Sequence, residues 1–380
     1  MLLLAMLDRF YFSPENYKYD FGPQHPLRPE RLARTLKLLE HYAGPGYLQA
    51  DPANEADLLL VHSPEYVDSV KMVDEAAANG RLGDDEILEL RSLYGFWGDN
   101  PPFAGMYHAA SVYTGASAAA AREVRDGARL AFAIGGGLHH ALRGKASGFC
   151  IFNDCAVACA ILRERFGKVA YVDIDVHQGD GVQWIFYNDP TVLTCSIHED
   201  GRTLWPGTGG VEEVAVDGSS INVPMEAGTT ADVWIDAFRR TIIPKLKQWG
   251  PEAIVLQMGT DTHYWDPLAH INSNQQAWLE AVKEVQALDL PIVAVGGGGY
   301  NITTVPRMWT SACLTLAGVP FEDEIPAEPA YLLQRRMLGV DLSGPRDPVT
   351  NPTFSDVDYP CGKNHGREHA DRVIRHYGFR

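Results

Sequence analysis

The chain is 380 residues long, and 46% of its residues are hydrophobic while 21% are charged, which indicates an ordinary globular protein with one large α/β domain or two smaller ones. The net charge of −17 argues against a nucleic-acid-binding surface. It would attract a cationic partner, such as a lysine-bearing peptide or a polyamine, although it also fits an acidic protein that is kept soluble by its charge.

The first seven residues, MLLLAML, are apolar and are followed by Asp8 and Arg9. No basic segment precedes this run, and it is too short for a signal peptide or a membrane span. We therefore expect it to form a first buried strand, and we expect no contact with a membrane.

The cysteines lie mostly inside apolar or strand-like stretches and form no CxxC pair; they are Cys150, Cys155, Cys159, Cys195, Cys313 and Cys361. This placement favours reduced thiols in the cytoplasm over the disulfide framework of a secreted protein. We do not expect the first three to form a metal cluster.

Short apolar runs that end at glycine or a polar turn predict the strands of a parallel sheet that is covered on both faces. They are Leu130–Ile134, Val169–Ile174, Val192–Ile197, Ala253–Met258 and Pro291–Val295. Helical stretches lie between them, at Ala116–Arg125, Ala156–Arg165, Thr230–Trp249 and Gln275–Ala287. This alternation has no clear linker, so the sequence predicts one doubly wound α/β domain over residues 1–380. Over 321–380 the alternation is lost, and we expect loops with a final helix near Arg367–Tyr377.

Polar residues follow four of the five predicted strands. His139 and His140 follow the first, the segment 173–180 follows the second, Asp261 follows the fourth, and Tyr300 follows the fifth. The carboxyl ends of parallel strands meet at one edge of a sheet, where ligands bind. These side chains are therefore expected to converge.

Asp175 and His177 are two residues apart at a strand end, so their side chains leave on one face. Asp261, from another strand, would complete a metal site of two carboxylates and one imidazole. Three protein ligands leave a fourth position open, which catalytic zinc needs in order to activate water and polarise a carbonyl oxygen. The pattern therefore predicts hydrolysis of an amide.

Two histidines supply candidates for the base that takes a proton from water and returns it to the leaving amine, namely His139 and His140. Asp173 and Asp180 are the unassigned acids of the neighbouring loop, and each is expected to orient one imidazole. Tyr300 lies beside a run of glycines and is a candidate donor to the developing oxyanion.

Taken together, the segments GGGLHHA, GFCIFND, YVDIDVHQGDG, WPGTG, MGTDTHYWDP and GGGGYN resemble the arginase-fold histone deacetylases. The resemblance runs in order from about residue 8 to residue 320, and the segment HPLRPER is most similar to bacterial acetoin-utilisation deacetylases. It implies a single-domain arginase/deacetylase-type fold, with a central parallel sheet of about eight strands and helices on both faces. It also implies removal of acetyl or related acyl groups from lysine side chains of proteins or peptides, with release of acetate.

The resemblance implies a role for each residue of the predicted centre. His140 is implied as general base and acid, and His139 as an electrostatic partner or proton shuttle. Asp173 would lie behind His139 and Asp180 behind His140, and Tyr300 would donate to the oxyanion.

The same resemblance implies two kinds of metal ion. Zn²⁺, or Fe²⁺ in the cell, would be bound by Asp175, His177 and Asp261. K⁺ would be bound by the carbonyl groups of Asp173, Asp175, His177 and Ile197 and by the side chain of Ser196.

Residues around the substrate are implied in the same way. Phe149 and Trp205 would wall a narrow tunnel for the acyl-lysine stem, although relatives commonly have phenylalanine at the position of Trp205. Arg31 corresponds to an arginine of the family that lines an internal exit for acetate. The remaining implied substrate contacts are Asp99 at the rim, Gly148, Leu268 and Gly298.

Several alternatives remain open, as does the oligomeric state. An acetylpolyamine hydrolase would use the same ligands and differ only in tunnel shape and rim acids. An arginase-type ureohydrolase would need an Asp-x-Asp pair, which the segment GTDTH at 259–263 lacks. A non-catalytic acyl-lysine-binding scaffold would be expected to have lost a ligand or Tyr300. The HxxEH pattern of His365, Glu368 and His369 matches inverted zinc proteases, but it lies near the chain end and contains glycine, so we expect no metal there.

Overall fold

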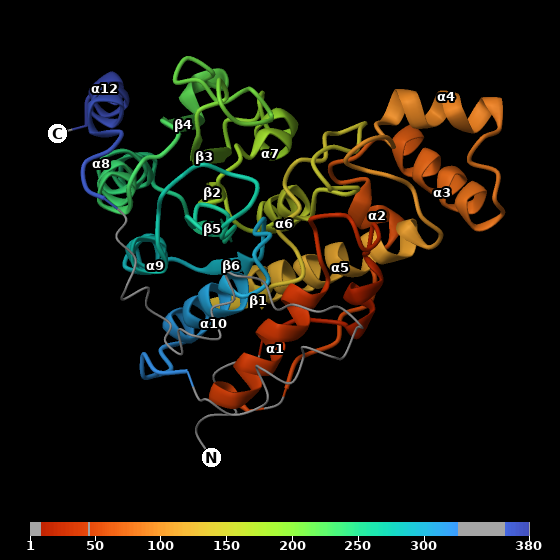
Figure 1. The fold of residues 1–380 in the computed structure, drawn as a ribbon, viewed down its shortest axis with the longest axis horizontal. Helices are drawn as coiled ribbons and strands as arrows, with labels where there is room; N and C mark the ends of the chain where they lie inside the picture. Colours follow the sequence, from red (N-terminus) through yellow and green to blue (C-terminus); the bar gives the residue numbers. More distant parts are fainter. Residues whose placement is uncertain (1–8, 45, 326–361, 380) are drawn as a thin grey trace.

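The computed structural model describes residues 9–44, 46–325 and 362–379. Its centre is a parallel sheet with the strand order β1-β6-β5-β2-β3-β4 (Figure 1). The strands are β1 (Leu130–Ala133), β2 (Val169–Asp173), β3 (Val192–Glu199), β4 (Ser220–Met225), β5 (Ala253–Gln257) and β6 (Ile292–Val295). Five of them confirm the predicted runs to within two residues. The sequence analysis did not identify β4, an edge strand that contains polar residues and Pro224, which an edge position tolerates.

The expected number of about eight strands is wrong for the described residues, which form a sheet of six strands. Beyond β1 the ladder continues only as two isolated parallel bridges, Phe10 with Phe132 and Tyr11 with Leu48. Such single bridges extend the hydrogen bonding without forming further strands. The first strand that we predicted, over residues 1–7, lies outside the described residues.

Helices cover both faces of the sheet (Figure 1). One layer contains α5 (Met106–Arg125), α6 (Asp154–Leu162) and α7 (Asp180–Ile185), and the other contains α1 (Glu30–Ala43), α8 (Ala231–Trp249), α9 (Gln275–Gln286), α10 (Thr304–Ala317) and α12 (Arg367–Tyr377). Successive strand residues point to opposite faces. Accordingly, Val169 and Tyr171 of β2 pack in the first layer, whereas Ala170 and Val172 pack in the second.

The predicted helices are found, and α12 has the predicted bounds. The largest difference is at α5, which begins at Met106 instead of Ala116. Most of α5 is buried, and a helix that is buried on nearly all sides shows no clear polar face in its sequence. The rest of the segment expected to form loops, 326–361, lies outside the described residues.

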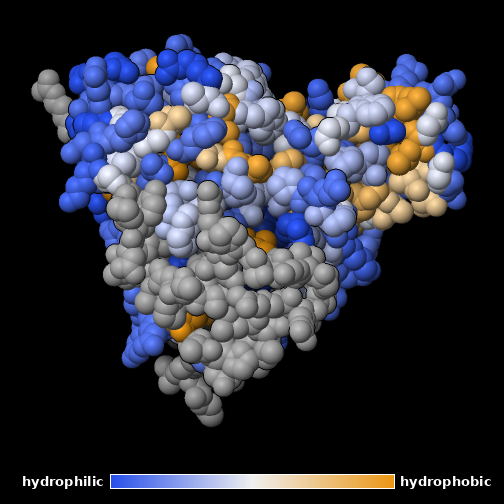
Figure 2. Space-filling model, in the orientation of Figure 1, coloured by the Kyte–Doolittle hydropathy of each residue, from blue (hydrophilic) through white to orange (hydrophobic). Residues whose placement is uncertain are grey.

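A pair of helices projects from the body of the molecule (Figure 1). It consists of α3 (Pro64–Ala78) and α4 (Asp85–Tyr94), which follow the short α2 (Glu55–Leu58). Figure 2 shows a mainly hydrophilic surface, with hydrophobic residues gathered on this projection, where Met72 and Leu93 are exposed. Short 3-10 helices complete the fold at Pro14–Lys18 and Val216–Gly218.

The five cysteines within the described ranges are buried and form no disulfide. No helix of the described residues is long and apolar enough to cross a membrane.

Gly115 in α5 gives a test of the packing. An alanine usually stabilises a helix by about 1 kcal/mol relative to glycine. At Gly115, however, an added Cβ would clash with backbone atoms of Asp51 and Ala53, which cannot move aside like the end of a side chain. We expect Gly115→Ala to lower the free energy of unfolding by about 1–3 kcal/mol, measured by urea denaturation. Gly83→Ala, which has open space around it, is the matched control and should change little.

Candidate active site

Four neighbouring strands deliver the polar residues to one edge of the sheet. The order β1-β6-β5-β2 places the loops that follow these strands side by side. His139 and His140 follow β1, Tyr300 follows β6, Asp261 follows β5, and the segment 173–180 follows β2. The structure therefore brings together the residues that sequence reasoning grouped at the strand ends.

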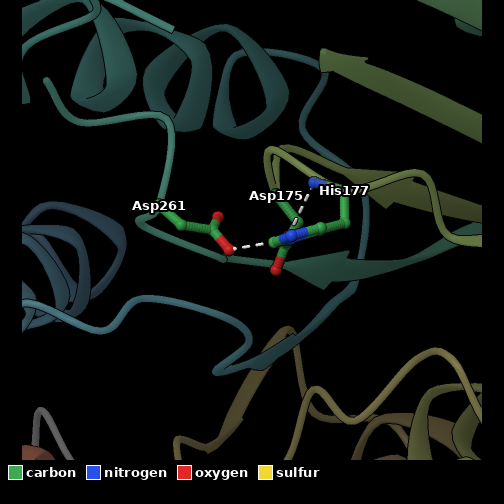
Figure 3. Close-up of side chains that lie close together, drawn as sticks. All are labelled: Asp175, His177 and Asp261. Atoms are coloured by element: carbon green, nitrogen blue, oxygen red, sulfur yellow. Dashed lines mark hydrogen bonds and ion pairs between the residues drawn. The ribbon is translucent and has the colours of Figure 1, made fainter. Parts of the chain in front are cut away.

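Asp175, His177 and Asp261 form a compact, buried group (Figure 3). Their ligand atoms all lie within 4.8 Å of one another. His177 Nδ1 is 3.1 Å from Asp175 Oδ1 and also 3.1 Å from Asp261 Oδ2. Among the described residues, this is the one group of three or more histidine, cysteine or acidic residues with the geometry to hold a metal ion.

The charges of this group fit a divalent cation. Burial alone would lower the pKa of His177, but the carboxylates of Asp175 and Asp261 raise it well above its usual value. Two buried carboxylates thus draw a positive charge to the point between them. A metal ion satisfies the same demand, because buried carboxylates that share a site repel each other unless a cation is present.

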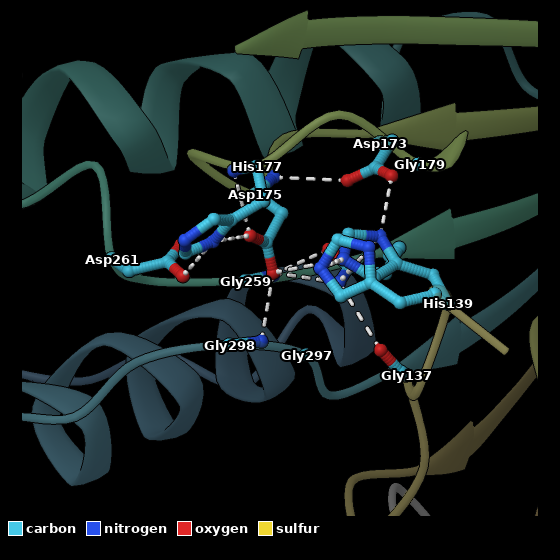
Figure 4. A network of polar contacts seen from close by, with 12 residues as sticks. Gly137, His139, Asp173, Asp175, His177, Gly179, Gly259, Asp261, Gly297 and Gly298 are labelled. Carbon is cyan, nitrogen blue, oxygen red and sulfur yellow. Dashed lines mark hydrogen bonds and ion pairs between the residues drawn. The ribbon is translucent and has the colours of Figure 1, made fainter. Parts of the chain in front are cut away.

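Hydrogen bonds fix both carboxylates (Figure 4). Asp175 Oδ2 accepts from Gln257 Nε2 at 2.8 Å and from the Gly298 N–H at 2.7 Å. Asp261 Oδ1 accepts from the Val176 N–H at 2.9 Å. The oxygen atoms Asp175 Oδ1 and Asp261 Oδ2 remain directed at His177, which orients them toward one point.

Two histidine–aspartate pairs lie beside the group formed by Asp175, His177 and Asp261. His139 Nδ1 is 2.7 Å from Asp173 Oδ2, and His140 Nδ1 is 2.7 Å from Asp180 Oδ1. The Nε2 atoms of the two imidazoles are 2.9 Å apart. Each aspartate therefore stands behind the histidine with which it was paired in the sequence analysis.

The two imidazoles differ in protonation. Burial opposes a charge on His139, but the carboxylates of Asp173 and Asp175 outweigh it and raise the pKa of His139 to about 9. Burial and the positive charge of His139 lower the pKa of His140 to about 4. These shifts favour a protonated His139 that donates from Nε2 to the unprotonated Nε2 of a neutral His140.

Aromatic rings lie close to His140 and His177. The Trp205 ring centroid is 4.6 Å from that of His140, and the Tyr300 ring centroid is 6.4 Å from that of His177 and 5.7 Å from that of Phe149. Gly148 has φ 50°, and a Cβ there would clash with His140 and Trp205. Glycine is therefore required at 148 both for backbone conformation and for space.

The remaining implied substrate residues lie at different distances from this centre. Asp99 is exposed, and its carbonyl oxygen is 3.3 Å from Nε2 of His25, whose ring packs against Phe149 with centroids 4.5 Å apart. The sequence analysis gave His25 no role, although this contact connects Asp99 to the aromatic wall. Leu268 is half-buried in the loop that carries Asp261, and a Cβ at Gly298 would clash with the Asp261 carboxylate.

Arg31 is buried in α1 behind the loop that follows β6. Its Nη1 donates to the carbonyl oxygens of Gly297 at 2.8 Å and Gly299 at 3.0 Å. A small internal pocket borders Arg31, and Asn16 also lines it. Both polar atoms of the buried Asn16 side chain lack a hydrogen-bond partner, so this pocket contains unsatisfied polar groups.

The residues implied for a potassium ion lie where β2 and β3 end. Asp173 of β2 pairs in register with Ser196 of β3, and Ile197 follows Ser196. The loop after β2 is joined to β3 by the Glu199 N–H, which donates to Val176 O at 2.8 Å. Asp173, Asp175, His177, Ser196 and Ile197 are therefore neighbours.

The HxxEH histidines lie apart from these residues. His365 Nε2 is 3.3 Å from Ala227 O, and His369 Nε2 is 3.1 Å from Pro224 O. Neither residue belongs to the metal-binding geometry found in the described part of the chain.

Several supporting residues were not identified from the sequence. Asn153 Nδ2 donates to the carbonyl oxygens of His139 and Ala141, and Asp154 accepts from the N–H groups of Gly137 and Leu138. Tyr171, Gln257 and Asp266 likewise bind residues of the centre. The available signal was a polar residue at the end of an apolar run, which applies to Gln257 and to Asn153 and Asp154 at the start of α6.

Comparisons with known proteins identify the family to which this chain belongs. Residues 25–316 match the model of the histone deacetylase domain. The chain is 38% identical over 334 residues to the acetoin utilization protein AcuC of Bacillus subtilis, covering 84% of each chain. It is 33% identical over 326 residues to histone deacetylase B of Dictyostelium discoideum, covering 83% of this chain and 75% of the relative. A crystal structure of an HDAC homolog from Aquifex aeolicus superposes with a TM-score of 0.86 at 26% identity, covering 97% of this chain and 99% of the homolog. The chain therefore belongs to the histone deacetylase family.

Proposed function

We propose that this protein is a zinc-dependent amidohydrolase that removes acetyl or related acyl groups from lysine side chains of proteins or peptides and releases acetate. The observation that carries the proposal is the convergence of a buried Asp-His-Asp group, two histidine–aspartate pairs and Tyr300 at one sheet edge. The same fold holds SAHA in a solved HDAC homolog, at a TM-score of 0.86.

Asp175, His177 and Asp261 are the residues that would hold the zinc ion. When bound there, Zn²⁺ supplies a Lewis acid that polarises the amide carbonyl and lowers the pKa of water. Gln257 and the Gly298 N–H keep Asp175 in place, which limits the reorganisation of this ligand during the reaction.

His140 is the group that moves the proton. The lowered pKa of His140 leaves its Nε2 free to accept a hydrogen bond from water in place of the one from His139. His140 then takes the proton of this water and later delivers the proton to the leaving amine. Asp180 on Nδ1 fixes the required tautomer. Protonated His139 adds positive charge beside the developing oxyanion.

Tyr300 and the aromatic walls complete the mechanism. The Tyr300 hydroxyl, whose pKa is raised by burial, stays protonated and donates a hydrogen bond to the oxyanion. Phe149 and Trp205 hold the apolar stem of the acyl-lysine and exclude water, and Asp99 binds the substrate backbone at the rim. The small pocket beside Arg31 supports the exit for acetate implied by the family resemblance, since the guanidinium would attract this anion.

A potassium ion at the ends of β2 and β3 is a further part of the proposal. The adjacent positions of Asp173 and Ser196 support it, since carbonyl groups and a serine hydroxyl are the hard oxygen ligands that such ions take. An ion there would stabilise the loop that carries Asp175 and His177.

Acetylpolyamine hydrolysis remains the second candidate, because the same residues would perform it and the net charge of −17 attracts polyamines as well as peptides. Only a direct comparison of substrates separates the two activities.

The metal site gives the first test. We expect about one zinc ion per chain by elemental analysis of the purified protein, and loss of that zinc in His177→Ala, since this change removes one of the three ligands. The matched control is His365→Ala in the HxxEH segment, which should keep its zinc. Equal zinc content in both variants would contradict the assigned ligands.

Substrate turnover gives the second test. An acetyl-lysine peptide and N-acetylated polyamines are assayed side by side with wild-type protein and Tyr300→Phe. We expect peptide turnover that a chelator abolishes, and a kcat about 100-fold lower for Tyr300→Phe because one oxyanion donor is lost. Preference for the polyamines would move the protein to the alternative activity, and no turnover of either substrate would support a non-catalytic scaffold.

The asymmetry of the two histidines gives a third test. We expect His140→Ala to lower kcat about 10²–10⁴-fold, since the proton-transferring group is removed. His139→Ala should cost less, because water can replace its hydrogen bond to His140 but not the proton transfer itself. A larger loss in His139→Ala would exchange the two roles.

A further inference from the structure

The carboxylate of Asp266 joins the loop that follows β5 to the loop that follows β6. Asp266 is buried, with 7% of its surface exposed. Its Oδ2 accepts from the N–H of Tyr300 at 2.7 Å, and its Oδ1 accepts from the N–H of Leu268 at 3.0 Å. One side chain thus fixes one backbone position in each of two loops.

The backbone leading to Tyr300 needs such a contact. Gly297 and Gly299 have φ values of 154° and 128°, and Tyr300 lies outside any helix or strand. Glycine has weak backbone preferences, so contacts with other segments must set the position of Tyr300. Arg31 holds the carbonyl oxygens of Gly297 and Gly299, whereas Asp266 holds the N–H of Tyr300 itself.

A second hydrogen bond joins the same two loops but does not involve Tyr300. Asn301 Nδ2 donates to the carbonyl oxygen of Trp265 at 3.1 Å. That contact ties the loops together one residue beyond Tyr300. Asp266, in contrast, accepts a hydrogen bond from the backbone N–H of Tyr300 itself.

We propose that Asp266 is a positioning residue that aims the hydroxyl of Tyr300, which rests on the proposed role of Tyr300 as oxyanion donor. A small rotation of the backbone at Tyr300 is amplified at the end of its long side chain. A misplacement of about 1 Å in a reacting group costs on the order of 100-fold in rate. Asp266 would act through the backbone of Tyr300 and Leu268, to which its two oxygen atoms are bonded.

Asp266→Asn preserves size but leaves one acceptor oxygen for the two N–H groups of Tyr300 and Leu268, so it is measured together with Asp266→Ala, which removes both acceptors. We would measure kcat and KM for an acetyl-lysine peptide with wild type, Asp266→Asn, Tyr300→Phe and the double variant, all zinc-loaded. We expect Asp266→Asn to lower kcat about 10- to 100-fold in the wild-type background, and by less than about 3-fold in the Tyr300→Phe background, where the hydroxyl is already absent. Asp217→Asn, the same change at an exposed site, is the matched control.

Equal losses of kcat in both backgrounds would overturn the proposal, since Asp266 would then act independently of Tyr300. So would a kcat that is unchanged in both Asp266→Asn and Asp266→Ala, or a loss explained by lower zinc content. Amide hydrogen exchange of the 296–301 segment gives a readout that needs no activity. Faster exchange in Asp266→Asn than in Asp217→Asn supports the contact even if wild type fails to turn over the peptide, which would refute the proposed function alone. Unchanged exchange in both Asp266→Asn and Asp266→Ala overturns the inference.

Discussion

The burial of several carboxylates at one sheet edge is the constraint on which the rest of this structure depends. Asp173, Asp175 and Asp261 are fully buried within a short distance of one another. Buried like charges repel unless cations or hydrogen-bond donors compensate them. The neighbouring imidazoles, the backbone N–H groups and the proposed metal ion would all compensate this buried negative charge. The same electrostatics that would destabilise an empty site therefore favour a loaded one.

Many hydrogen-bond donors to the buried carboxylates are backbone N–H groups, which must lie close to the carboxylate oxygens. The Gly298 N–H reaches Asp175, and the N–H groups of Gly137 and Leu138 reach Asp154. Side chains at Gly137, Gly297 or Gly298 would clash with backbone or side-chain atoms of the opposite loop. The glycine runs after β1 and β6 are thus explained by close packing of the site loops.

The protonation of the two histidines follows from this arrangement. The carboxylates of Asp173 and Asp175 raise the pKa of His139, whereas burial and the charge of His139 lower the pKa of His140. Adjacent residues of the same type thus receive different roles from their surroundings. A family relationship alone would assign these roles by correspondence, whereas the distances to Asp173 and Asp180 supply their physical cause.

The class of the fold and the residues that meet at the sheet edge could be predicted from local patterns in the sequence. Apolar runs such as Val169–Ile174 are long enough to reveal a strand, and local spacing places Asp175 and His177 on one face. The sequence did not determine β4, the number of strands or the start of α5, because edge position and burial on all sides leave no clear periodicity. Nor did it reveal Gln257, Asn153 or Asp266, whose partners lie in other loops. Only the order of the strands brings these loops together, so hydrogen bonds between them, and the protonation states that depend on them, were decided by the tertiary structure.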